Sequence, residues 1–216
     1  LEFLAELKLN NHKEWFDKHR TRYERARKDF SSYVTCLLEA ISGFDPTIKG
    51  LGVQSCTYRI NRDIRFSDDK TPYKIHFGAF IVKGGKRFGD RYAGYYIHVE
   101  PGGNSMIAGG AYMPPMPWLR EIREKIGTEG ERLVEIISNR EFADFYGSLE
   151  GEKLKGAPRG FTSDNPFIDL LRMKSFLATR MIPDSVIVSP EGFDLAVRAS
   201  RIMKPLNDFL NDYQAG

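Results

Sequence analysis

The feature that most constrains the fold is a long run of apolar residues at helical spacing near the N-terminus. Phe16, Tyr23, Phe30 and Leu37 recur every seven residues, which places them along one face of a helix. The stripe lasts for about thirty residues and ends at the turn-forming sequence "GFDP". Because a helix of this kind has to bury its apolar face, the rest of the chain must supply a layer that covers it.

The covering layer is predicted to be a sheet, because segments with strand character follow the helix. "SCTYRINRDIRF" alternates between polar and apolar residues, and "IHFGAFIV" is rich in β-branched and aromatic residues. "YAGYYIHVE" and "MIAGGAY" come next, and the connections between them contain glycine. Strands at this spacing are typical of an antiparallel meander.

After "MPPMP", apolar residues return to helical spacing. The order of helix, sheet and helices predicts an α+β fold, with a curved antiparallel sheet of four or more strands packed by the long N-terminal helix and the C-terminal helices. We predict one domain over residues 1–216, with N-terminal helices in 1–46, the antiparallel sheet in 51–113 and a mainly helical part in 114–216. A hydrophobic content of 41% is enough to fill a sizeable core in a domain of this size.

Composition argues against several classes of protein. The net charge of +3 is too small to indicate a nucleic-acid-binding protein. No run approaches the roughly eighteen apolar residues of a membrane span, so no membrane association is expected. Cys36 and Cys56 lack CxxC spacing and are predicted to be buried, reduced thiols, as is typical of a cytoplasmic protein. The sequence predicts no particular oligomeric state.

One of the strand-like segments is unusual because its polar face is rich in arginine. In a strand, Arg59, Asp63 and Arg65 would share one face, and Arg62 would lie on the opposite, apolar face. Arginine suits bidentate contact with a carboxylate or phosphate, whereas solvation alone would also accept lysine. From Arg59 to Arg91 the chain carries nine Lys/Arg against four Asp, so the basic excess is confined to the predicted sheet.

Neighbouring segments carry polar residues at compatible parity. His76 shares its predicted face with Gly78, and His98 shares its predicted face with Glu100. Glycine inside a strand often marks space for a ligand or another backbone. The loop that follows the arginine-rich segment, where binding residues tend to concentrate, adds two more cations, Lys70 and Lys74.

We therefore hypothesise a cleft that binds a small anionic ligand bearing a phosphate or a carboxylate. The ligand-binding candidates are Arg59, Arg62, Arg65, Lys70, Lys74 and Glu100, and the catalytic candidates are His76, His98 and Asp63. Histidine titrates near neutral pH, so His76 or His98 could carry protons if the site is catalytic. The sequence leaves open whether the protein is an enzyme and which cofactor, if any, it uses.

Three alternatives stay open at this point. The Arg-Asp motif could be an internal ion-pair lattice in a non-enzymatic interaction or structural module. The aromatic residues of the basic region could instead hold single-stranded nucleic acid, although half of them should face the core. The candidate residues also match the ligand types of a metal site with two histidines and a carboxylate, but no short motif such as HExxH supports one, so no metal is predicted.

Three motifs point to a known family. They are "LNNHKEWFDKHRTRYE" near the N-terminus, the pattern Arg-Asp-x-Arg-Phe-Ser-x-Asp-Lys-x-Pro-Tyr-Lys at Arg62–Lys74, and a later "GGAYMP". On these motifs the sequence resembles a bacterial and fungal family known as domain of unknown function 2461, over most of the chain. The resemblance is consistent with a single domain in a cytoplasmic setting, and it implies no particular activity, cofactor or catalytic residue.

Overall fold

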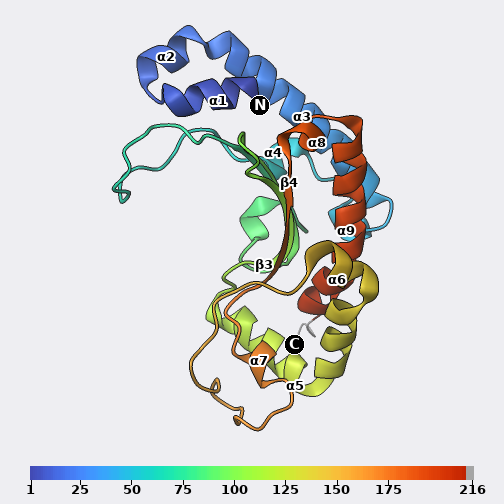
Figure 1. Cartoon of the computed structure of the whole chain (residues 1–216). Coiled ribbons are helices and arrows are strands. Elements are labelled where there is room, and N and C mark those ends of the chain that lie inside the picture. Colours follow the sequence, from blue (N-terminus) through green and yellow to red (C-terminus); the bar gives the residue numbers. More distant parts are fainter. Residues whose placement is uncertain (213–216) are drawn as a thin grey trace.

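The computed structural model describes residues 1–212 and contains a four-stranded antiparallel sheet with helices packed against it (Figure 1). The strands are β1 (Phe77–Ile81), β2 (Gly94–Val99), β3 (Ser105–Ala111) and β4 (Phe176–Ile182). The α-helices are α1 (Glu2–Leu9), α2 (Lys13–Lys18), α3 (Arg20–Ser42), α4 (Val53–Cys56), α5 (Met116–Ser138), α6 (Arg140–Tyr146), α7 (Ile168–Leu171), α8 (Asp184–Ile187) and α9 (Pro190–Asn211). Two short 3-10 helices are η1 (Pro46–Ile48) and η2 (Lys86–Phe88).

The sheet confirms the predicted α+β class, and its strands follow the order β1-β2-β3-β4. The fourth strand was not expected, because β4 comes from the part of the chain that was predicted to be mainly helical. Its residues pair with β3 in a long antiparallel register that includes Ala108↔Thr179. Phe176, Ala178 and Ile182 alternate as buried positions along β4, so the strand period is present in this segment and was overlooked.

Within residues 1–212, the long helices α3 and α9 pack against one face of the sheet. Tyr95, Ile97 and Ile107 are buried on the face that packs against α9 and α3. A side chain at Gly109 would bring a Cβ atom within 2.5 Å of the Met203 side chain, so glycine allows α9 to lie close to β3. The sheet is curved, with α9 behind its convex side and the concave side turned away from these helices (Figure 1).

Residues 57–74, which we name the arm, do not form the predicted strand. Only two isolated bridges occur, Thr57↔Ala79 at the edge of β1 and Asn61↔Tyr73 across the base of the arm. Beyond this base the chain extends away from the sheet (Figure 1). The prediction of a regular strand here is wrong because β1 is too short to pair with these residues, so their charged side chains meet one another and the solvent.

A pair of hydrogen bonds from Asn11 fixes the base of the arm. The Asn11 amide donates to the Tyr73 carbonyl at 2.9 Å, and its oxygen accepts from the Tyr73 backbone N–H at 3.1 Å. The Tyr73 ring is buried and stacks on Phe16 with ring centroids 4.0 Å apart. The helix-capping region before α2 is therefore joined to the residues that lead into β1.

The cysteine prediction is confirmed for one of the two residues. Both cysteines are free, and Cys56 is buried as predicted, but Cys36 is exposed because it lies on the outer face of α3. Within residues 1–212, no helix combines the length and the apolar character needed to cross a membrane.

Replacing Asn11 with Ala should lower the free energy of unfolding by about 1–3 kcal/mol, because two half-buried backbone groups of Tyr73 lose their partner. Asn10→Ala is the matched control, since Asn10 is also half-buried but makes one local bond, to the Glu6 carbonyl. Urea unfolding of both variants checks this. Equal losses in the two variants would contradict the role given to Asn11.

Candidate functional site

Three polar side chains meet on the concave face of the sheet. The His98 Nε2 atom lies 3.0 Å from Glu100 Oε2, and His76 Nδ1 lies 3.9 Å from the same oxygen. The two imidazole rings are close, with centroids 4.2 Å apart. His98 is inside β2, Glu100 follows that strand, and His76 immediately precedes β1. We name these three residues the His-Glu cluster.

Strand register explains why the cluster forms. His98 lies directly opposite Gly78, so the adjacent even-numbered residues of β1 and β2 share the concave face. A Cβ atom at Gly78 would lie 3.0 Å from the Tyr96 hydroxyl, which shows that the tyrosine occupies the space left by the glycine. The space beside this glycine is therefore filled by a tyrosine of the neighbouring strand.

Tyr96 extends the cluster by one hydrogen bond. Its hydroxyl lies 3.1 Å from His98 Nδ1, so both ring nitrogens of His98 have partners. Because a carboxylate only accepts hydrogen bonds, an ionised Glu100 requires a proton on His98 Nε2. In a neutral His98, Nδ1 then accepts a hydrogen bond from the Tyr96 hydroxyl. Burial first, and then the nearby Tyr58 and Glu100, raise the pKa of Tyr96 to about 12, so its hydroxyl stays protonated.

His76 is the imidazole of the cluster that has no hydrogen-bond partner among the described residues. Its side chain is 27% exposed, against 11% for His98 and 17% for Glu100. Burial lowers the pKa of His76 to about 4, and the charges of His98 and Lys74 act in the same direction while Glu100 opposes them. At neutral pH His76 is therefore an uncharged ring with nitrogen lone-pair density available to a ligand.

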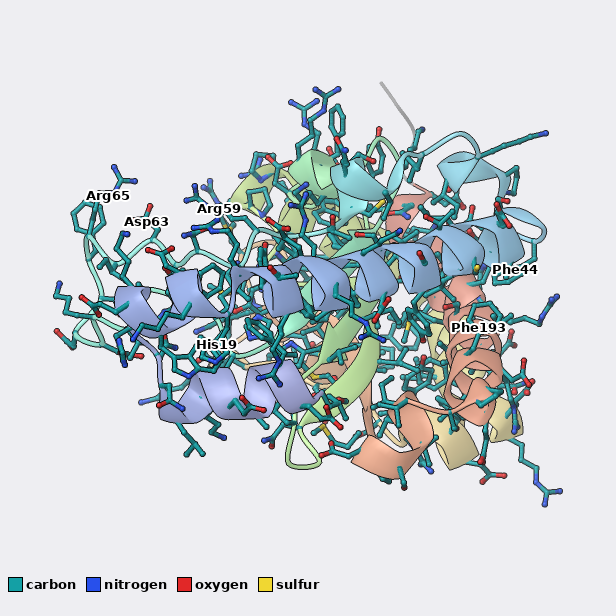
Figure 2. All side chains as sticks on the ribbon, turned by 90° about the horizontal axis from the view of Figure 1, so that it is seen from above. His19, Phe44, Arg59, Asp63, Arg65 and Phe193 are labelled. Atoms are coloured by element: carbon teal, nitrogen blue, oxygen red, sulfur yellow. The ribbon has the colours of Figure 1, made fainter. Side chains whose placement is uncertain are left out.

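The charged residues of the arm, apart from Lys74 at its base, do not join this cluster. Arg65 Nε and Nη2 donate to the two carboxylate oxygens of Asp63 at 2.9 and 2.7 Å. This pair is exposed at the outer end of the arm, and Arg59 lies closer to the body (Figure 2). The bond from Arg65 lowers the pKa of Asp63, so Asp63 is an ionised, paired carboxylate and not a proton carrier beside the histidines.

Arg62 holds the arm together from inside. Its guanidinium donates to Asp69, Thr71 and Ser67. The backbone N–H of Thr71, followed by Arg62, lowers the pKa of Asp69 to about 2. These contacts assign Arg62 to the structure of the arm and not to the concave face.

The lysines of the arm divide between its tip and its base. Lys70 donates to the Ile64 carbonyl in the exposed part of the arm. Lys74 lies at the base, with its ammonium 5.3 Å from the centre of the Tyr58 ring. The Tyr58 backbone N–H bonds to the Gly78 carbonyl, so this lysine stands at the β1 edge of the concave face. Burial, followed by the charge of Arg59, lowers the pKa of Lys74.

The structure thus brings together four of the nine candidate side chains, namely His76, His98, Glu100 and Lys74. The other five, Arg59, Arg62, Asp63, Arg65 and Lys70, precede Lys74 in the arm and do not contact the cluster within the described residues. The sequence analysis did not include Tyr96 among the candidates, although its hydroxyl lies beside His98. The sequence also could not show that Tyr58, at the base of the arm, bonds to the backbone of β1.

A hollow of about 460 Å³ lies elsewhere, between the start of α5 and the loop that precedes α7. Its wall is mainly apolar, with Met113, Leu119 and Leu154 among the lining residues. The Arg123 guanidinium donates to the Leu171 and Met173 carbonyls, and so is already engaged with the backbone. Arg159 and Lys174 also line this hollow, but no histidine or carboxylate of the described residues does. We favour the His-Glu cluster as the candidate site, because it places two imidazoles beside a carboxylate.

Comparison with known families gives a match over nearly the whole chain. The sequence model of a family described as a conserved hypothetical protein (DUF2461) matches residues 1–209. The chain belongs to this family. The DUF2461 description assigns no activity. Searches of the curated proteins and of the solved structures find no significant match.

The DUF2461 motifs quoted above have identifiable structural positions in this chain. Asn11 binds the backbone of Tyr73, and Arg62 binds Asp69 within the arm. The Asn11 bonds connect the N-terminal motif with the central motif, and the Arg62 bond lies within the central motif. The His-Glu cluster lies outside the central motif, and its first member, His76, comes two residues after Lys74.

Acid should destabilise the protein through His76. Its pKa is about 4 in the folded state against an ordinary value of 6.5, so the unfolded chain binds more protons between these values. The contribution of His76 to the free energy of unfolding is therefore complete above pH 6.5. As the pH drops toward 4 the free energy of unfolding falls, by roughly 3 kcal/mol at most. Urea unfolding of wild type and His76→Asn across this range should show a shallower acid loss in the variant.

His12→Asn is the control for this comparison, because His12 is an exposed histidine that caps α2, and asparagine is also a good helix cap. It should keep the wild-type acid loss. A His76 imidazole that titrates near pH 6.5 in an NMR experiment would contradict the burial and the charges described here.

Proposed function

We propose that the concave face of the sheet binds a small anionic ligand, carrying a phosphate or a carboxylate, at the His-Glu cluster. The observation that carries this proposal is His76, a half-buried imidazole without a hydrogen-bond partner among the described residues, beside the His98–Glu100 pair on a face turned away from α3 and α9. A partly exposed imidazole that can bind from solution, beside two further polar side chains, is a suitable position for a ligand.

Positive charge at the edge of the face supports an anion as that ligand. Lys74 and Lys86 lie 5.3 and 6.0 Å from the centre of the Tyr58 ring. Neither lysine forms an ion pair within residues 1–212, and neither does Arg59. The lowered pKa of Lys74, caused by burial and by Arg59, means that an added negative charge would be favourable there.

The cluster also offers acid–base chemistry. Glu100 accepts from His98 Nε2, which orients the imidazole ring. The neutral His76 can accept a proton or a hydrogen bond from a bound ligand. In this proposal His98 and Glu100 position each other, and His76 is the residue that touches the ligand.

A structural role for the arm is compatible with this site. The Arg65–Asp63 and Arg62–Asp69 pairs are complete within the arm, as expected for the ion-pair lattice considered from the sequence. We propose that these pairs hold the arm in shape, while its base places Lys74 and His76. The arm therefore serves the site from a distance and contributes only its base to the ligand.

Lysine substitutions distinguish the contribution of the base of the arm to phosphate binding from that of its tip. Lys74→Ala should weaken the binding of inorganic phosphate, used as the probe, by about tenfold or more, because a charge-assisted contact is lost. Lys70→Ala is the matched control, since Lys70 binds only the Ile64 carbonyl near the tip, and should leave phosphate binding unchanged. Isothermal titration calorimetry of wild type and both variants gives the affinities.

The opposite pattern, with Lys70→Ala weakening phosphate binding and Lys74→Ala leaving it intact, would move the site to the arm tip. Absence of phosphate and carboxylate binding by the wild-type protein at millimolar concentrations would remove the proposal altogether.

A further inference from the structure

We propose that His76, His98 and Glu100 bind a divalent transition-metal ion such as Zn²⁺, and that this ion holds the anionic ligand. The metal site stands on its own geometry. The role of the ion in holding an anion rests on the proposed function. The sequence analysis predicted no metal, because the two histidines and the glutamate are not joined by a short motif, and only the strand register brings them together.

The donor set suits such an ion. Two imidazole nitrogens and one carboxylate oxygen are typical ligands of first-row divalent metals, in sites that keep a further position open. The candidate ligand atoms of His76, His98 and Glu100 all lie within 4.8 Å of one another. All three come from the paired strands β1 and β2 or from residues next to them, which limits how far they can separate.

The distances are close to those that a metal requires. Bonds of about 2.0–2.2 Å in a tetrahedral arrangement place neighbouring ligand atoms about 3.4 Å apart. The Glu100 Oε2 atom lies 3.0 Å from His98 Nε2 and 3.9 Å from His76 Nδ1, one shorter and one longer than that value. Each of these two distances differs from the tetrahedral value by about half an ångström.

One adjustment falls mainly on His76. The ring centroids of His76 and His98 are 4.2 Å apart, whereas two imidazoles on one tetrahedral ion stand roughly 5 Å apart. The rings must therefore separate by about 1 Å. His76 precedes β1 and is the more exposed of the two, so its ring can turn outward without disturbing the sheet.

Tyr96 supplies the second partner that a metal-binding histidine needs. A metal at His98 Nε2 requires the proton to move to Nδ1, which then donates to the Tyr96 hydroxyl oxygen at the same 3.1 Å position. The tyrosine hydroxyl can accept as well as donate, so it serves both tautomers of His98. The change moves one proton within the ring and leaves the number of bound protons unchanged.

An ion also removes a difficulty in binding an anion beside Glu100. Without a cation, the Glu100 carboxylate would repel a phosphate or carboxylate placed at the cluster. A divalent ion reverses the local charge and offers an open coordination position to an anionic oxygen. Lys74, which acts electrostatically on His76, would then contact the far side of the same anion.

The test is Zn²⁺ binding by the full-length protein without a histidine tag, followed by calorimetry and, with Co²⁺, by visible absorption. We expect one ion per chain, and a loss of affinity of at least about tenfold in His76→Ala and in the isosteric Glu100→Gln. His12→Asn is the matched control, because His12 Nδ1 lies 3.0 Å from Glu14 in a surface pair that lacks a third ligand. It should bind Zn²⁺ as the wild type does.

Circular dichroism confirms that each variant is folded, and His76→Ala decides the test if Glu100→Gln unfolds, since His76 is the most exposed ligand. No stoichiometric binding by the wild type, or equal affinities in wild type, His76→Ala and Glu100→Gln, would overturn the metal site.

A phosphate titration with and without a chelator separates the two proposals. We expect phosphate affinity to fall at least tenfold when the ion is removed. Equal phosphate affinity in the presence of chelator would overturn the role of the ion in holding the anion and leave the proposed function intact. Zn²⁺ binding without any phosphate or carboxylate binding would overturn the proposed function and leave the metal site intact.

Discussion

The whole arrangement depends on a sheet that, within residues 1–212, has the long helices α3 and α9 packed against one of its faces. Tyr95, Ile97 and Ile107 fill the covered face, where α9 and α3 exclude water. The opposite, concave face cannot rely on helices for packing, so its polar side chains have to satisfy one another or bind something from solution. His98, with partners at both nitrogens, is the satisfied member of this face, and His76 is the available one.

The arm and the cluster are connected through a short stretch of backbone. Asn11 binds both backbone groups of Tyr73, and Tyr73 stacks on Phe16. Only two residues separate Tyr73 from His76, so the clamp on Tyr73 also limits where Lys74 and His76 can lie. We propose that the motif shared with the DUF2461 family fixes the entry of β1, and through it the geometry of the cluster.

Periodicity was sufficient to predict the class of fold. The stripe of Phe16, Phe30 and Leu37 is helical as predicted, but the structure divides it at His19 into α2 and α3 instead of one continuous helix. The strand alternation around Tyr95 and Ile97 corresponds to β2. Local patterns failed where pairing partners decide the outcome. The arm alternates like a strand but β1 ends beside its base, and β4 lies far along the chain from the β3 strand that pairs with it.

Local alternation likewise predicted one part of the candidate site and failed for the other part. Parity correctly placed His76, His98 and Glu100 on one face, because side-chain alternation is a local property that holds once two strands pair. It placed Arg59, Asp63 and Arg65 beside them only by assuming that the arm continues the sheet. The bidentate Arg65–Asp63 contact depends on a turn at the end of the arm that no alternation rule describes.

In the proposed function, the anionic ligand binds the concave face of the sheet and not the outer part of the arm. Chemical-shift mapping by NMR, with a nitrogen-15-labelled protein titrated with phosphate, tests it most directly. The account predicts that the amide signals of Gly78, Tyr96 and His98 move while those of Asp63 and Arg65 do not. Shifts confined to the outer part of the arm, with the strand signals unchanged, would contradict it.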